Sequence, residues 1–214
     1  MMTLTLTRGI HAALTITSGS TTLVVDPGAF GFPGSVANAD AVLVTHDHFD
    51  HVDVPALAVA LEDNPGLHVY TPTHLSLEAN VDRQTLVSEG DEFMVGDVSV
   101  SVIGREQATA SIDDDVIINV GYLIGGLVLH PGDARPVIKN LDTLIVALAA
   151  PWQSTPQLEE YLRVVTPARV IGLHDGTLND LGRNFGQKTL ARIASSYGGE
   201  AISLNPGESV TLPH

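Results

Sequence analysis

Histidine and aspartate alternate in one short stretch of the sequence, "HDHFDH" at residues 46–51. Imidazole nitrogen and carboxylate oxygen are the ligands that zinc and related transition metals take in proteins. His46 and His48 can aim at one point as the chain leaves a strand, and Asp50 and His51 can face a second point close by. The spacing predicts two neighbouring cation sites. A solvated polar loop and histidines satisfied inside the core are the alternatives.

The segments on either side of this stretch are predicted to hold it in place. "DAVLVT" (40–45) is a continuous run of apolar and β-branched residues, typical of a strand buried on both faces. "VPALAVALED" (54–63) has Pro55 in its first turn and good helix formers after it, which predicts a helix. The ligand-type side chains therefore gather where a buried strand ends.

Two later positions repeat this placement. Asp133 in "HPGD" follows a predicted hairpin of "VGYLI" (120–124) and "LVLH" (127–130), and His174 in "GLHDG" ends a predicted strand over 168–176. A residue that shapes a turn is the alternative for Asp133, and a capping or core histidine is the alternative for His174. In an open α/β sheet, strand ends collect at one edge, so we expect both residues to reach the loop at 46–51.

The remaining segments mix strands with helices. Strands are expected at 3–7, 12–18, 21–26, 67–71, 92–95, 98–103 and 141–151, with two short ones within 201–212. Helices are expected at 72–80, after Pro156, and at 186–197, with loops at 26–35 and 104–118. This interspersion favours sheets flanked by helices in a layered α/β arrangement.

Composition limits the function. The chain has 214 residues, 44% of them hydrophobic, and a net charge of −15. We expect one domain over 1–214, a small-molecule substrate and no nucleic-acid partner, because phosphates would be repelled. Cysteine is absent, so a metal must be held by imidazole and carboxylate. With no apolar run near the ~20 residues of a membrane span, we expect a cytoplasmic protein. The oligomeric state is left open.

The stretch "HDHFDH" after a buried strand fits the signature H-x-H-x-D-H, and the chain resembles the metallo-β-lactamase fold hydrolases over nearly its whole length. The resemblance looks closest to a small single-domain branch related to sugar-lactone hydrolases and lipid phosphodiesterases. It implies an α/β fold, a four-layer αβ/βα sandwich of two mixed β-sheets flanked by helices, with metals at one edge. The implied cofactor is one or two Zn²⁺ ions, with Mn²⁺ as the alternative.

The same resemblance assigns roles to residues. It implies that His46 and His48 bind the first metal, that Asp50 and His51 bind the second, that Asp133 bridges both, and that His174 completes the second site. Asp50 would also be catalytic, by orienting the nucleophilic water.

Residues outside these motifs divide into two groups. "VVDPGA" resembles an early loop of the family, which makes Asp26 a carboxylate that orients a liganding histidine. The resemblance also places His11 of "RGIHAALTI" near the pocket. Judged without the resemblance, the histidines outside the main motifs are expected to be structural or solvated: His11, His68, His74, His130 and His214.

The sequence departs from the family pattern at one position. "GREQATA" has Gln107 where the family places a further histidine of the first metal site, and no histidine occurs from 75 to 129. An amide is neutral and binds zinc poorly, so the first site would keep two imidazoles and a weak oxygen from Gln107 or Glu106. The sequence predicts a first site that is weaker than the second.

Two functions follow. The first is a hydrolase that uses a metal-activated water on an ester, a lactone or a phosphodiester. The second is a catalytically impaired member of the family that acts as a metal or ligand binding module, for which Gln107 is the direct evidence. Six predicted ligand positions are intact, which favours the hydrolase.

Overall fold

The computed structural model describes residues 3–111, 113 and 115–213, which form two seven-stranded mixed sheets. The first sheet has the order β14-β1-β2-β3-β4-β5-β6 and the second β13-β12-β11-β10-β9-β8-β7. The strands of the first sheet are β1 (Thr3–Arg8), β2 (Leu14–Ser18), β3 (Thr21–Val25), β4 (Ala41–Leu43), β5 (His68–Thr71), β6 (Gln84–Leu86) and β14 (Ser209–Pro213). Those of the second are β7 (Glu92–Val95), β8 (Val98–Ile103), β9 (Gly121–Ile124), β10 (Val128–His130), β11 (Thr143–Ala147), β12 (Arg169–Leu173) and β13 (Glu200–Ile202).

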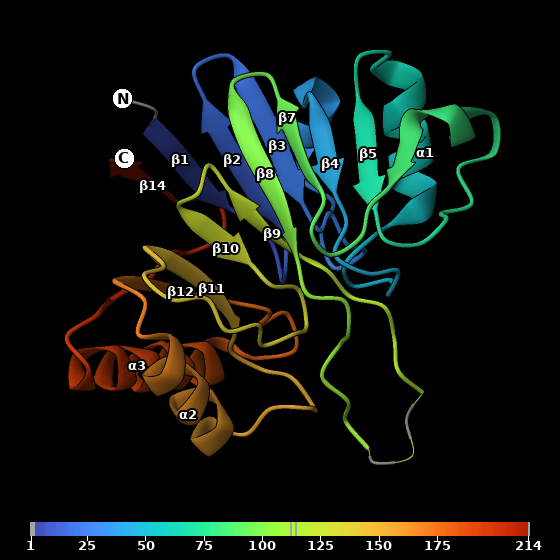
Figure 1. The fold of residues 1–214 in the computed structure, drawn as a ribbon. Coiled ribbons are helices and arrows are strands. Elements are labelled where there is room, and N and C mark those ends of the chain that lie inside the picture. Colours follow the sequence, from blue (N-terminus) through green and yellow to red (C-terminus); the bar gives the residue numbers. More distant parts are fainter. Residues whose placement is uncertain (1–2, 112, 114, 214) are drawn as a thin grey trace.

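The helices cover the outer faces of the two sheets. The described residues form three α-helices, α1 (Val54–Asp63), α2 (Thr155–Val165) and α3 (Asp180–Ser196), and two 3-10 helices, η1 (Gly34–Asn38) and η2 (Glu78–Arg83), which join strands of the first sheet. Figure 1 shows α2 and α3 beside β11 and β12 of the second sheet, with α1 next to β5 at the far side of the first. The layers are those of an αβ/βα sandwich, and the predicted fold class is confirmed.

The burial pattern of each strand fits its place in these layers. β1 alternates buried and less buried residues, whereas all five residues of β11 are buried because α2 and α3 cover one face and the first sheet the other. Apolar side chains from both sheets, such as Leu6 and Ile171, form one core between them. This core supplies the rigid frame on which the loops at one edge are carried.

The predicted helix over 54–63 is confirmed, and its start is fixed by Asp53, whose side chain accepts a hydrogen bond from the Ala56 amide. The predicted helix over 72–80 is wrong, because residues 72–77 are irregular before η2. The side chain of Gln84 accepts a hydrogen bond from the amide of Leu75 and donates one to its carbonyl. A distant side chain thus replaces the helical bonds of that segment.

The last helix begins earlier than the sequence predicts. α3 starts at Asp180 rather than at residue 186, and the side chain of Asn179 caps it by accepting a hydrogen bond from the Gly182 amide at 2.9 Å. The two glycines at 182 and 186 weaken the helical signal in the first turns.

Among the described residues, no helix is long and apolar enough to cross a membrane.

Parallel strands bring the predicted site residues to one edge. β3 and β4 run parallel in the first sheet, and β10, β11 and β12 run parallel in the second. β4 ends at Leu43, three residues before His46, and β12 ends at Leu173, directly before His174. Asp133 follows β10 by three residues. The carboxyl ends of strands from both sheets therefore deliver the ligand-type side chains to a common place.

Candidate metal centre

The loop that carries "HDHFDH" is hydrogen-bonded to the loop that follows β3. The Ala29 amide donates to the carbonyl of Phe49 at 2.8 Å, and the Asp53 amide donates to the carbonyl of Pro27 at 3.0 Å. A Cβ atom at Gly28 would lie 1.9 Å from the carbonyl oxygen of Asp50, so only glycine allows this approach of the two backbones. Gly28 of the Asp-Pro-Gly sequence is thus required where this loop contacts the histidine loop.

Seven side chains converge at this edge in two groups. The first cluster is His46, His48 and Asp133, and the second cluster is His11, Asp50, His51 and His174. Within each cluster the ligand-type atoms lie within 4.8 Å of one another. All six residues predicted as metal ligands are brought together, and His11 joins them.

In the first cluster two ring nitrogens face each other. Nε2 of His46 and Nδ1 of His48 are 3.1 Å apart, and Oδ2 of Asp133 lies 3.8 Å from Nε2 of His46. His46 is fully buried, whereas His48 is half-buried and lines a cavity. Three protein groups of this kind can hold one transition metal ion and leave a position for another ligand.

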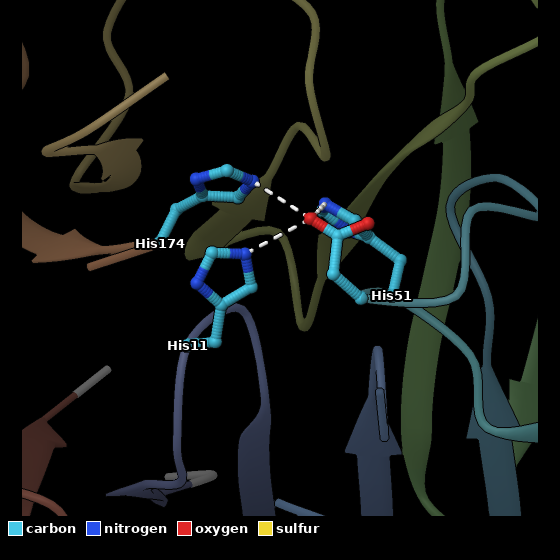
Figure 2. Close-up of side chains that lie close together, drawn as sticks. His11, His51 and His174 are labelled. Atoms are coloured by element: carbon cyan, nitrogen blue, oxygen red, sulfur yellow. Dashed lines mark hydrogen bonds and ion pairs between the residues drawn. The ribbon is translucent and has the colours of Figure 1, made fainter. Parts of the chain in front are cut away.

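In the second cluster the imidazoles surround one carboxylate, as Figure 2 shows for His11, His51 and His174. Oδ2 of Asp50 lies 3.1 Å from Nε2 of His11, 3.6 Å from Nε2 of His174 and 4.0 Å from Nε2 of His51. The three rings come from the turn between β1 and β2, the loop after β4 and the end of β12. Segments far apart in the sequence thus build one site.

Asp133 stands between the clusters. Its Oδ1 lies 3.3 Å from Nε2 of His51 and 3.4 Å from Nε2 of His174, and its Oδ2 faces the first cluster. Two hydrogen bonds hold Asp133 in this position. The Trp152 indole N–H donates to its Oδ2 at 3.1 Å, and its backbone amide donates to Oδ1 of Asn119 at 2.9 Å. This is the placement that a carboxylate shared by two ions needs.

Hydrogen bonds on the far side of the rings fix which nitrogen faces the site. Nδ1 of His51 donates to Oδ2 of Asp26 at 2.8 Å, and Nδ1 of His174 donates to the Ala149 carbonyl at 2.7 Å. The Thr45 hydroxyl donates to Oδ2 of Asp26 and therefore accepts from Nδ1 of His46 at 3.0 Å. These contacts place the proton of each ring, in its neutral form, on Nδ1, so that Nε2 can offer a lone pair to a metal ion in the site. The contact of Asp26 with a predicted ligand is the one the sequence led us to expect.

The donor set fits a metal ion. Nε2 of His51, Nε2 of His174 and Oδ1 of Asp133 are buried and have no hydrogen-bond partner among the described residues. Buried polar atoms without hydrogen-bond partners are costly. These three atoms face one another across 3.3 and 3.4 Å, so one bound cation can contact all of them. Two nitrogen lone pairs and a carboxylate oxygen are the ligands of a divalent transition metal.

The electrostatics of the metal-free cluster also favour a cation. Burial opposes a charge on His51, but the carboxylates of Asp26 and Asp133 outweigh burial and raise its pKa to about 10. Burial acts against the charged form of Asp133 as well, yet contact with His51 holds the pKa of Asp133 well below its usual range. Burial and the neighbouring charge of His51 lower the pKa of His46 to about 3. A proton or a metal ion is stabilised beside His51, while His46 stays neutral and able to ligate.

Gln107 lies where the sequence predicts a weak point. It lines a cavity with His48, and the Ala108 amide donates to the carbonyl of Asp133 at 2.9 Å, which fastens this loop beside the first cluster. Oε1 of Gln107 is buried without a hydrogen-bond partner among the described residues. The side chain of Glu106 is 61% exposed and pairs with Arg105. Gln107, rather than Glu106, is therefore the candidate oxygen ligand.

The prediction that His11 is structural or solvated is wrong. His11 is buried, only 1% exposed, and its ring belongs to the second cluster. The residues around His11 gave no sign of this, because a single histidine in a turn carries no spacing signal and the turn reaches the site only through the pairing of β1 with β2. The expectation from the family resemblance, that His11 of "RGIHAALTI" lies near the pocket, is confirmed. Trp152 was missed for a similar reason, since only the fold shows that its indole contacts Asp133.

The other histidines that the structure describes follow the expectation. His130 donates from Nε2 to the Ala12 carbonyl at 3.0 Å and accepts from the Gly132 amide, so both of its nitrogens are used in the scaffold. His68 contacts the Thr85 hydroxyl on the first sheet, and His74 is exposed. His214 lies outside the described residues.

Comparison with known proteins identifies the family of this chain. Residues 5–174 match the family model of the β-lactamase superfamily domain. The chain is 36% identical over 177 residues to Protein Rv0786c of Mycobacterium tuberculosis, covering 79% of this chain and 82% of that protein. It is 29% identical over 227 residues to a UPF0173 metal-dependent hydrolase of Nitratidesulfovibrio vulgaris, covering 94% and 92%.

Solved structures show the same fold. Igni18, a metallo hydrolase of Ignicoccus hospitalis, superposes with a TM-score of 0.71 at 16% identity, covering 99% of both chains. YhfI of Bacillus subtilis, a metallo-β-lactamase fold protein, gives a TM-score of 0.68 at 15% identity and covers 99% of this chain and all of that one. The two-sheet sandwich with a histidine and aspartate edge defines a metallo-β-lactamase fold protein. The chain belongs to the β-lactamase superfamily, and its relatives include UPF0173 metal-dependent hydrolases.

Proposed function

We propose that the protein is a metal-dependent hydrolase that cleaves an ester, a lactone or a phosphodiester with a metal-activated water. The observation that carries this proposal is the convergence of Nε2 of His51, Nε2 of His174 and Oδ1 of Asp133, all buried and without hydrogen-bond partners. A ligand set prepared in this way, beside a cavity, serves metal-assisted hydrolysis in this class of fold.

His51, His174, Asp50 and Asp133 would hold the more tightly bound ion, and His46, His48 and Asp133 a weaker one. We propose Zn²⁺, with Mn²⁺ as the alternative, because imidazole and carboxylate suit both. A bound dication would lower the pKa of its water toward neutrality and polarise the oxygen of the substrate. A cytoplasmic location remains part of the proposal.

The protein's own side chains would orient the reactants. Burial raises the pKa of Asp50, but the contact with His11 and the nearby charges outweigh it and lower that pKa to about 2, so the carboxylate is ionised at neutral pH. An ionised Asp50 accepts hydrogen bonds and can hold the nucleophilic water with one lone pair toward the substrate. Asp26 fixes the ring of His51, and Trp152 fixes Asp133, so the ligands need little rearrangement.

The cavity beside the first cluster bears on the substrate. It has a volume of about 340 Å³ and is lined by His48, Gln107, Ala108, Thr109, Ala110, Asp115, Ile117, Pro151 and Trp152. None of these described lining residues is a lysine or an arginine, and the chain carries a net charge of −15. An anionic group would find no positively charged side chain among these lining residues. The lining supports a neutral ester or lactone ahead of a phosphodiester.

A turnover panel tests the proposal. The zinc-loaded and manganese-loaded protein should hydrolyse at least one neutral ester or lactone faster than a phosphodiester of similar size. The chelator-treated protein should be inactive and should recover when the metal is returned. Faster phosphodiester cleavage would reject the substrate preference, and no turnover across the panel would reject the hydrolase.

Gln107 favours a second function. If the amide leaves the first cluster too weak to hold an ion, the protein retains the fold as a metal or ligand binding module. This alternative predicts that the protein binds one ion tightly and shows no turnover on any arm of the panel, whatever metal is supplied.

A further inference from the structure

His11 differs from the other rings of the second cluster in what its far nitrogen does. Nδ1 of His51 and Nδ1 of His174 both donate to oxygen atoms, which leaves Nε2 free to ligate. Nδ1 of His11 instead accepts a hydrogen bond from the backbone amide of Gly176 at 3.0 Å. A backbone N–H can only donate, so this contact fixes the direction of the bond.

This direction determines where the proton of His11 sits. Because Nδ1 must offer its lone pair to Gly176, the proton of a neutral ring is on Nε2. Nε2 lies 3.1 Å from Oδ2 of Asp50, a carboxylate oxygen that can accept the hydrogen bond. The Nε2–H group of His11 therefore donates to Asp50, and the ring has no lone pair on the side that faces the cluster.

The surrounding backbone holds His11 in this orientation. The His174 amide donates to the His11 carbonyl at 2.8 Å, and Arg8 of β1 forms a buried ion pair of 2.5 Å with Asp175. These contacts join the end of β1 and the turn that follows it to the loop after β12. His11 adopts φ 59°, a left-handed conformation that a residue other than glycine keeps only when its neighbours enforce it.

We propose that His11 is a positioning residue and not a metal ligand, even though it lies within ligand distance of the second cluster. This inference rests on the proposed function, because His11 orients Asp50, which that function makes the residue that orients the water. The hydrogen bond from Nε2–H occupies one lone pair of Oδ2 and keeps that oxygen facing the rings of His174 and His51. His11 thus sets the orientation of the carboxylate that orients the water.

Nuclear magnetic resonance of labelled histidine nitrogens tests this assignment directly. The full-length protein is loaded with an NMR-active cadmium isotope. We expect metal-to-nitrogen coupling at Nε2 of His51 and His174, no coupling at His11, and a His11 ring protonated at Nε2 and not at Nδ1. Coupling between cadmium and Nε2 of His11 would overturn the proposal. If no cadmium binds at all, the proposed function fails, while the protonation of His11 is still read in the metal-free protein and a proton on Nδ1 rejects its role.

Paired substitutions separate positioning from ligation. His11→Gln keeps an N–H donor near Asp50, and His11→Leu removes it. For a positioning residue, His11→Leu should lower kcat by about ten- to a hundredfold with KM little changed, and His11→Gln should restore most of the loss. Both variants should still bind zinc, whereas the ligand variant His174→Ala should not hold it at the second cluster. Equal loss of zinc in all three variants would identify His11 as a ligand, and equal kcat in parent and His11→Leu would show that it positions nothing.

A change outside the cluster gives a matched control. A Cβ atom at Gly176 would lie 3.0 Å from Nδ1 of His11, so Gly176→Ala should displace the ring without removing a cluster side chain. We expect its kcat to fall in the direction of His11→Leu and its zinc content to stay at the parent level. Parent kcat in Gly176→Ala, with the amide contact to His11 shown to be lost, would contradict the proposed link.

Discussion

The two clusters share one edge of the fold and one aspartate, but they differ in how completely their ligands are supplied. The second cluster offers two imidazoles with lone pairs fixed toward the site, Asp50 and one oxygen of Asp133. The first offers two imidazoles and the other oxygen of Asp133, with a neutral amide at position 107. The difference teaches that a family signature can be intact while the two sites it builds are unequal.

Removing a ligand of the second cluster should have the largest effect. We expect His51→Ala and His174→Ala each to lower metal-dependent turnover on the order of a thousandfold, because the tighter ion is lost with the ring. Kinetics and metal content of the variants check this. His68→Ala is the matched control, since His68 lies on the first sheet outside both clusters. Parent turnover in either ligand variant would remove the second cluster from the chemistry.

Asp50→Asn tests whether this carboxylate orients the nucleophile or only balances charge. Asparagine keeps the shape and removes the charge, so the variant should retain some metal at high concentration yet lose about a hundredfold or more in kcat. The measurement is turnover at saturating zinc for parent and variant side by side. Equal rates would show that Asp50 does not orient the nucleophile and has only a structural role.

Gln107→His should make the two clusters more alike. A third imidazole would complete the first cluster, so we expect the variant to hold a second equivalent of zinc and to gain about tenfold in affinity for it. Titration calorimetry with zinc separates the two binding events. A variant with unchanged stoichiometry and activity would show that residue 107 does not face the first ion.

The smallest effect concerns the stability of the metal-free protein against pH. Burial lowers the pKa of His51, but the carboxylates of Asp26 and Asp133 outweigh burial and raise this pKa from 6.5 to about 10. A raised pKa means that the folded state holds a proton which the unfolded chain releases. This contribution is complete below about pH 6.5 and is lost as the pH rises toward 10. The melting temperature of chelator-treated parent should therefore fall more steeply from about pH 7 to 9 than that of His51→Gln. Parallel curves would mean that His51 is not charged without metal.

The sequence predicted the fold class and six clustered side chains because both depend on local patterns. Buried strands ending at His46 and His174 and the H-x-H-x-D-H spacing are readable within a few residues. His11 and the contact of Trp152 with Asp133 depend on strand pairing and loop packing between distant segments. No periodicity carries that information. The helix expected at 72–80 failed for the same reason, since the side chain of Gln84 outcompetes local propensity.

The central claim, that the second cluster is the stronger of two unequal metal sites, is tested most directly by metal content. Zinc-loaded protein is dialysed against a chelator and analysed for metal per chain. The unequal ligand sets predict about one retained equivalent, lost in His174→Ala and kept in His48→Ala, because only the second cluster has a complete set of fixed ligands. Two equivalents that survive dialysis in the parent, or one that is lost in His48→Ala and kept in His174→Ala, would contradict the account.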